Sequence, residues 1–178
     1  RRHSFPTRRS SDLIGMVSRP ETIEIIAQTL KKYSLPPLVI DPVMISKSGY
    51  DLLQPEAKRA LIDILLPMAT LITPNLPEAE VIVGYTIDTI ELMKKAALDL
   101  HKLGCKYVLV KGGHLENDAT DVLYDGETFH LLHSARLKTI NTHGTGCTLS
   151  SAIAANLAKG LPVKEAVEAA KAYITEAI

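Results

Sequence analysis

Short apolar runs alternate with stretches of helical hydrophobic period along the chain, from about residue 14 onward. The runs IGMV, PLVID, TLIT and KYVLVK favour strands, and the last three end at Asp41, Thr73 and Lys111. A different pattern follows in the second half of the chain. TDVLYDGETFHLLHS predicts two strands around the turn Asp125–Gly126, because Asp-Gly between apolar runs is a strong hairpin signal.

Helices are predicted between these strands from their apolar period and their end signals. The helix over residues 19–33 opens with a capping box of Ser18 and Glu21. A later helix opens with a capping box of Asp88 and Glu91 and closes at Gly104. Its apolar positions are Leu92, Met93, Ala96, Leu100 and Leu103. The remaining predicted helices cover 55–66, a short stretch after PNLP, a stretch from the HGTGC turn to about 159, and a stretch from 163.

Strands that alternate with helices predict an α/β fold, in which a mostly parallel sheet carries helices on both faces. Ligands of such sheets bind beyond the carboxyl ends of the strands. Unusual polar groups follow several strand ends in this chain: Asp41, the turn from Thr73 to Glu78, Lys111 with GGH, and the turn THGTGC. We therefore expect these groups to converge at one edge of the sheet.

The composition predicts one globular domain and excludes some partners. A chain of 178 residues can bury a real core, and its formal net charge of zero gives no electrostatic signal for nucleic acid or an anionic membrane. No apolar run approaches the ~18 residues of a membrane span. The two cysteines show no pairing pattern, which indicates a reducing compartment and therefore favours the cytoplasm.

Residues 1–13, RRHSFPTRRSSDL, differ from the rest of the chain. They contain four arginines, one acidic residue and no apolar period. Arg- and Ser-rich starts occur in transit peptides, but this one has no amphipathic pattern. We interpret residues 1–13 as a non-native or disordered extension, and residues 14–178 as the folded domain.

The stretch HGTGC places two glycines before a helix of small residues. Gly144 and Gly146 leave the backbone N–H groups unobstructed, and the helix start adds free N–H groups and a positive dipole end. This combination predicts an anion site for phosphate or for developing negative charge. No GKS or GKT follows, so the turn is not a Walker loop. The alternative is a plain turn from loop to helix.

Cys147 falls in the first turn of that predicted helix. Such a position lowers a thiol pKa from ~8.5, in some proteins to ~3.5–7.5, and the thiol could then accept a proton from a substrate hydroxyl. The alternative is a small hydrophobic residue that packs where two backbones approach each other. The local sequence leaves both interpretations open.

Four further residues, of which Asn75 and Glu78 act as a pair, carry polar groups that allow two interpretations. Asn75 and Glu78 could reach a hydrated Mg²⁺, but their spacing favours a capping box. Lys111 could give a point charge to phosphate or be a solvated lysine at a strand end. Asp41 could orient a metal ion or water, or form an Asx-turn.

The six histidines form no ligand set, so no structural zinc is predicted.

Four segments together resemble a known family in their order and spacing: LVIDPVMISKSGYDLL, LITPNLPEAE, VLVKGGH and NTHGTGCTLSSAIAANLAKG. The family is the hydroxymethylpyrimidine/phosphomethylpyrimidine kinases of thiamine biosynthesis, in the ribokinase-like superfamily, and the resemblance covers residues 14–178. It implies a three-layer α/β/α sandwich and a homodimer when full length. It also implies that ATP and Mg²⁺ are used to phosphorylate hydroxymethylpyrimidine and its monophosphate.

The resemblance implies a role for each matching residue. The anion hole and the base correspond to Gly144, Thr145, Gly146 and Cys147. The pair that organises Mg²⁺ and phosphate corresponds to Asn75 and Glu78. The nucleotide side corresponds to Lys111, Gly112, Thr142, Asn75 and Asp41.

The chain also departs from the family pattern. The family's glycine-rich first segment supplies the first strands and much of the pyrimidine pocket, and here the Arg-rich run stands in its place. We therefore expect a partial kinase domain, without its N-terminal strands and a short C-terminal piece, that is inactive alone. One alternative is a pyridoxal or pyridoxine kinase of the same superfamily. Another is a non-catalytic, ligand-sensing domain on the same scaffold.

Overall fold

The computed structural model describes residues 10–46, 49–113, 120–133 and 144–177, and this part of the chain contains a six-stranded sheet. Its strands lie in chain order: β1 (Asp12–Ile14), β2 (Leu38–Ile40), β3 (Leu71–Ile72), β4 (Tyr107–Val110), β5 (Asp121–Tyr124) and β6 (Phe129–Leu132). Strands β1 to β4 are parallel, and β5 and β6 add an antiparallel hairpin at one edge. The predicted mostly parallel sheet and the predicted hairpin are confirmed.

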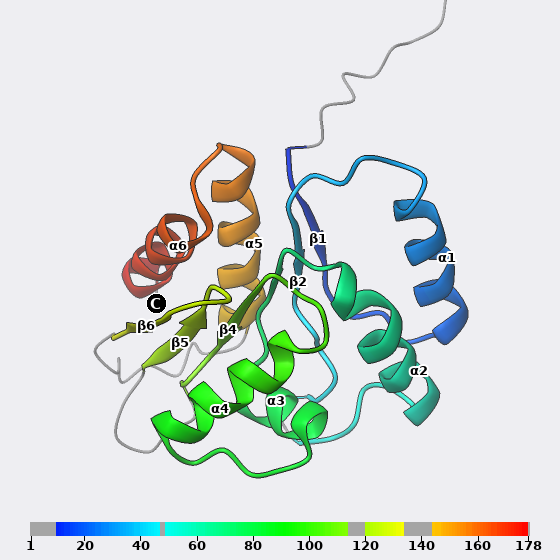
Figure 1. Cartoon of the computed structure of the whole chain (residues 1–178), viewed down its shortest axis with the longest axis horizontal. Helices are drawn as coiled ribbons and strands as arrows, with labels where there is room; N and C mark the ends of the chain where they lie inside the picture. The colour runs from blue at the N-terminus through cyan, green and yellow to red at the C-terminus, as the bar shows by residue number, and fades with distance from the viewer. Residues whose placement is uncertain (1–9, 47–48, 114–119, 134–143, 178) are drawn as a thin grey trace, which may run out of the picture.

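Helices cover both faces of the sheet, so the fold has three layers (Figure 1). One face carries α1 (Pro20–Leu30), α2 (Pro55–Ala60), α3 (Leu76–Val83) and α4 (Ile90–His101). Beyond α2 the helix widens into a π-turn, Leu61–Leu65, and then tightens into a 3₁₀ turn, Leu66–Met68. The other face carries α5 (Thr145–Ala158) and α6 (Val163–Ala177). Within the described ranges, no helix has the length and apolar character needed to cross a membrane.

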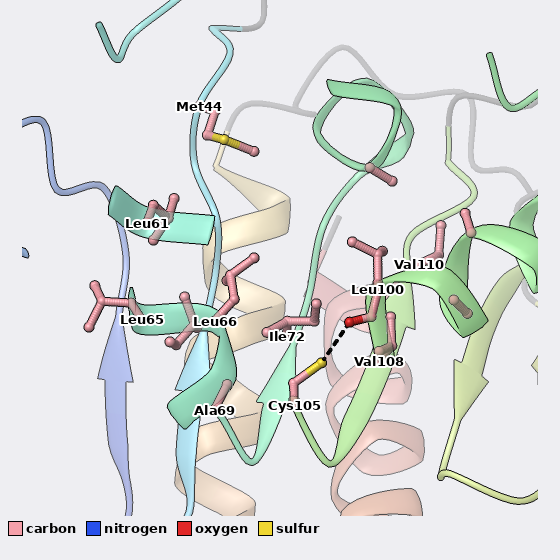
Figure 2. Close-up of a cluster of buried hydrophobic side chains, with 14 of the residues drawn as sticks. Met44, Leu61, Leu65, Leu66, Ala69, Ile72, Leu100, Cys105, Val108 and Val110 are labelled. Carbon is pink, nitrogen blue, oxygen red and sulfur yellow. Dashed lines mark hydrogen bonds between the residues drawn. The ribbon is translucent and has the colours of Figure 1, made fainter. Parts of the chain in front are cut away.

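Alternate residues of the strands feed two hydrophobic cores, one on each face of the sheet. In β2, Leu38 and Ile40 belong to the larger core, which is packed by α1 to α4, while Val39 belongs to the core packed by α5 and α6. All three are buried, because a parallel sheet between two helix layers has no face in water. Figure 2 shows the larger core, where the Cys105 thiol donates a hydrogen bond to the Leu100 carbonyl.

Two predicted capping boxes are wrong, although the helices behind them form. Arg19, not Ser18, is the N-cap of α1, and it makes no side-chain cap. Pro20 explains the shift, because proline favours the first helical position and holds the preceding residue in extended backbone. The cap of α4 is Thr89 rather than Asp88, since the Thr89 hydroxyl accepts the Leu92 N–H at 3.2 Å.

The first strand begins earlier than the boundary expected at residue 14. Asp12 and Leu13, which the sequence analysis assigned to the extension, pair in parallel with Leu38 and Val39 of β2. The Asp12 N–H also donates to the Pro37 carbonyl at 2.9 Å. Backbone pairing with a neighbouring strand, rather than hydrophobic period, decides where this strand starts, so β1 begins two residues before the apolar run that predicted it.

Candidate active site

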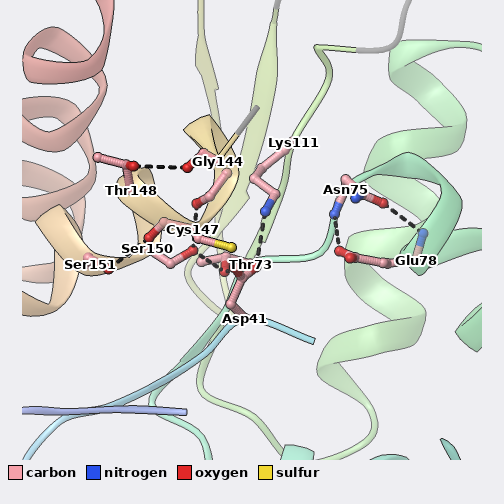
Figure 3. A network of polar contacts seen from close by, with 11 residues as sticks. Asp41, Thr73, Asn75, Glu78, Lys111, Gly144, Cys147, Thr148, Ser150 and Ser151 are labelled. Carbon is pink, nitrogen blue, oxygen red and sulfur yellow. Dashed lines mark hydrogen bonds and ion pairs between the residues drawn. The ribbon is translucent and has the colours of Figure 1, made fainter. Parts of the chain in front are cut away.

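Polar residues follow three neighbouring strands at one edge of the sheet, as the sequence predicts. Asp41 follows β2, Thr73 follows β3 and Lys111 follows β4. Because β2, β3 and β4 are parallel neighbours, their carboxyl ends face the same side. Figure 3 shows these side chains beside the first turn of α5, with the start of α3 close by. The expected convergence is therefore confirmed.

Lys111 and Asp41 form a buried ion pair at the centre of this edge. The Lys111 Nζ lies 3.1 Å from Asp41 Oδ1, and the two side chains are only 13% and 5% exposed. Lys111 is therefore not a solvated strand-end lysine, and the Asp41 carboxylate faces the site rather than a local turn. Removing either partner of such a pair leaves an uncompensated buried charge, which typically costs about 3–5 kcal/mol.

Two buried hydroxyls extend the ion pair toward α5; the sequence placed Thr73 among the polar groups at strand ends without giving it a role, and it did not single out Ser150. Thr73 Oγ1 donates to Asp41 Oδ1 at 3.3 Å and lies 2.9 Å from Ser150 Oγ. Both residues are fully buried. For Thr73 the available signal was a hydroxyl directly after an apolar strand, where an unpaired buried hydroxyl would be costly; Ser150 is one of several polar residues of α5 and gave no such signal.

The start of α5 is built so that backbone lies close to the lysine. Gly144 is the N-cap with φ +79°, a left-handed conformation that favours glycine, and it offers no side-chain cap. At Gly146 a Cβ atom would lie 3.2 Å from Lys111 Nζ, so a larger residue would crowd the ammonium. The helix start and the Lys111 charge therefore face one place, which suits an anion. Thr145 is the first residue of α5, and Thr142 lies outside the described residues.

Cys147 lies in the first turn of α5 as predicted, and its surroundings do not favour the acidic thiol, which was one of its two interpretations. The thiol is exposed, and its pKa is raised rather than lowered. Desolvation is the largest cause, the negative charge of Asp41 follows, and Glu78 adds a smaller effect. Lys111 acts in the opposite direction without outweighing them. The thiol is therefore protonated at neutral pH in the protein alone.

Asn75 and Glu78 form a complete capping box at the start of α3. Asn75 Oδ1 accepts the Glu78 N–H at 2.9 Å, and Glu78 Oε2 accepts the Asn75 N–H at 2.9 Å. Burial raises the pKa of Glu78 to about 7, although the Lys111 charge and the Asn75 N–H both lower it. The capping interpretation is therefore confirmed, and a buried carboxylate remains beside the lysine.

These residues fit a hydrated Mg²⁺ better than a metal caged by protein ligands. Within the described residues, no three His, Cys, Asp or Glu side chains gather as a metal site. Mg²⁺ usually keeps several waters and takes one or two carboxylates together with substrate phosphates. Because Glu78 Oε2 is already used by the Asn75 N–H, Glu78 would contact such an ion through its other oxygen or through water.

Gly112 has a structural explanation that the sequence did not provide. Its N–H donates to Asp121 Oδ1 at 2.8 Å, and a Cβ at this position would lie 1.8 Å from the Thr120 carbonyl oxygen. The other Asp121 oxygen accepts from Lys171 Nζ at 2.7 Å. Gly112 therefore lets the end of β4 approach the start of β5, and its N–H is used inside the protein.

Comparison with known proteins gives a consistent set of similarities. Residues 13–178 match the family model described as phosphomethylpyrimidine kinase. The hydroxymethylpyrimidine/phosphomethylpyrimidine kinase of Rhizobium meliloti is 52% identical over 168 residues, which is 93% of this chain. The crystal structure of a phosphomethylpyrimidine kinase from Clostridium difficile is 50% identical over 94% of this chain, with a TM-score of 0.84. An ADP complex of Bacillus subtilis pyridoxal kinase is 47% identical over 92%, with a TM-score of 0.85.

The chain is shorter than these relatives. It spans 62% of the Rhizobium meliloti kinase, 68% of the Clostridium difficile chain and 62% of the Bacillus subtilis chain.

Proposed function

Because this chain belongs to the phosphomethylpyrimidine kinase family, we propose that it carries the phosphate-binding part of a kinase of thiamine diphosphate biosynthesis. The reaction is transfer of a phosphoryl group from ATP to hydroxymethylpyrimidine and to its monophosphate. The observation that carries the proposal is the meeting of Lys111, Asp41 and the start of α5 at one edge of the sheet.

The arrangement suits phosphoryl transfer because that reaction depends mainly on positioning and on stabilising negative charge. The Lys111 ammonium and the N–H groups at the start of α5 would hold phosphate oxygens between them. Glu78 and Asn75 would hold a hydrated Mg²⁺, which supplies charge neutralisation when it is bound with ATP. Lys111 is already ordered by Asp41, so it would require little rearrangement to receive a phosphate.

Cys147 would take the proton of the substrate hydroxyl. Its resting thiol is protonated, so its own proton has to leave before it can act as a base. The thiol is exposed, so that proton can pass to solvent, and the Lys111 charge favours the thiolate that remains. Base catalysis of this kind contributes about 10²- to 10⁴-fold to a rate. In a catalytically complete protein, Cys147→Ala should lose turnover on this scale, and Cys147→Asp should retain part of it.

A segment exchange tests the proposed function. Residues 13–178 replace the matching segment of the Rhizobium meliloti kinase, and ADP formation is followed with hydroxymethylpyrimidine, its monophosphate or pyridoxal as acceptor. We expect ADP only with the two pyrimidines, and strongly reduced turnover for Lys111→Met and Cys147→Ala. A folded exchange protein that binds ATP but phosphorylates none of the acceptors would contradict the proposal and favour a ligand-sensing domain. The chain by itself should give no measurable phosphorylation.

A pyridoxal kinase is the second candidate, and one observation favours it. The Bacillus subtilis pyridoxal kinase is 47% identical to this chain, which is close to the identity of the pyrimidine kinases. ADP formation with pyridoxal but not with the pyrimidines would select this candidate. For either substrate we propose a cytoplasmic homodimer when full length, and a molar mass by light scattering would test the dimer.

A further inference from the structure

We propose that Thr73 and Ser150 are positioning residues for this site: their paired hydroxyls hold the first turn of α5, and with it Cys147, against Asp41 and Lys111. The inference rests on the proposed phosphoryl transfer, because a base must be held at a fixed place beside the hydroxyl that it deprotonates. It adds two residues that touch neither phosphate nor acceptor in that scheme.

The pair joins the end of β3 to α5, two elements that also share an apolar core through Leu71 and Leu149. Thr73 follows β3, Ser150 lies in α5, and 77 positions separate them in the chain. Both residues are fully buried, and their hydroxyl oxygens lie 2.9 Å apart (Figure 3). Buried hydroxyls need partners, so each of these two fixes the position of the other.

The two hydroxyls take part in three contacts between Asp41 and Gly146, but they have only two protons to donate. It runs from Asp41 Oδ1 to Thr73 Oγ1 at 3.3 Å, on to Ser150 Oγ at 2.9 Å, and ends at the Gly146 carbonyl at 3.1 Å. Each hydroxyl has a single proton to donate. When Thr73 donates to an ionised Asp41, Ser150 can donate to Thr73, and its contact with the Gly146 carbonyl is given up. The charge of Asp41 is thus linked to the turn that carries Gly146 and Cys147.

A neighbouring residue provides a matched comparison. Ser151 Oγ donates to the Cys147 carbonyl at 2.8 Å, so it makes the same kind of bond within α5 that Ser150 makes to Gly146. Ser151 is exposed, whereas Ser150 is buried against Thr73. Replacing Ser151 therefore removes a bond within the helix and leaves the bridge to β3 in place.

Alkylation of Cys147 by iodoacetamide reads the position of the thiol without requiring any phosphoryl transfer. The other cysteine, Cys105, is 1% exposed and its pKa is raised to about 11, so the fast reaction reports Cys147. Rates are measured from pH 6 to 10 on the full chain, with Cys147→Ala as the blank. The charged groups that act on this thiol are Asp41, Lys111 and Glu78, and none of them is altered.

We expect Ser150→Ala to release the turn from Asp41 and to shift the alkylation profile to lower pH. At pH 7.5 the rate constant should rise about threefold or more, which corresponds to half a pKa unit of thiolate fraction. Ser151→Ala should stay close to the unmodified chain. A Ser150→Ala profile that coincides with the Ser151→Ala profile would overturn the proposal.

A second comparison tests whether Ser150 acts through Thr73. In a Thr73→Val background the bridge is already cut, so adding Ser150→Ala should change the rate little, whereas Thr73→Ser keeps a hydroxyl and should preserve the original profile. An equal acceleration by Ser150→Ala with and without the Thr73 hydroxyl would also overturn the proposal, because Ser150 would then act only within α5. These outcomes are independent of whether the segment exchange phosphorylates a pyrimidine, so the two proposals can fail separately.

Discussion

Gly112→Ala should destabilise the fold strongly, although it adds one methyl group. The added Cβ would lie 1.8 Å from the Thr120 carbonyl oxygen, 2.9 Å from the Thr120 carbonyl carbon and 3.1 Å from Met93 Cε. The first two atoms belong to backbone, so no side-chain rotation relieves the contact. The end of β4 and the start of β5 would have to separate by roughly 1 Å, because non-bonded carbon and oxygen do not approach much below 3 Å.

The magnitude follows from two losses at this position. Overpacking a tight site costs about 1–3 kcal/mol. Separating the strands also breaks the buried bond from the Gly112 N–H to the Asp121 carboxylate, and a hydrogen bond to a charged group is worth about 1.5–3 kcal/mol. We therefore expect the free energy of unfolding to fall by about 3–5 kcal/mol. For a chain of this size, the melting temperature should fall by roughly 10 °C or more.

Gly113→Ala is the matched control, since a Cβ there would meet no atom of the described residues within 4 Å. Its unfolding free energy should stay within about 0.5 kcal/mol of the original. Urea and thermal unfolding followed by circular dichroism suit the comparison, because the chain has no tryptophan. Equal unfolding midpoints for the two variants would refute the reasoning, because they would show that Gly112 is not pressed against the Thr120 carbonyl.

Three further predictions concern the charged groups of the site. The pKa of Glu78 is about 7 in the folded protein against an ordinary 4.5, so its stabilising effect is complete below pH 4.5 and is lost as pH rises through 7. The loss amounts to about 3 kcal/mol, and Glu78→Gln should flatten it in urea midpoints measured between pH 5 and 8.5. An unchanged slope of stability against pH in the variant would contradict the burial argument. Lys111→Met leaves Asp41 buried without its cation, so the free energy of unfolding should fall by about 3–5 kcal/mol. A stability equal to the original would mean that the pair is open to water. Asp41→Asn removes a charge that raises the Cys147 pKa, so iodoacetamide should react faster at pH 7.5, and a slower reaction would show that another group controls the thiol.

The order of strands and helices could be predicted from the sequence because it depends on local hydrophobic period. The chain also indicated where polar groups would gather, since the carboxyl ends of parallel strands share one edge. The amino-acid sequence alone was therefore enough to predict that Asp41, Lys111 and the glycine turn lie together. The Asn75–Glu78 box could be predicted because both partners lie within four residues of each other.

Only the tertiary structure decided how those groups act on one another. Lys111 and Asp41 are 70 positions apart, so their burial as a pair is invisible in either local segment. Position in the helix left an acidic Cys147 open as one of two interpretations, but desolvation and the carboxylate that follows β2 raise its pKa. Electrostatic effects and close contacts depend on distances of a few ångströms between segments remote in the chain. Local sequence determines which groups are present and on which element they lie, and packing determines those distances.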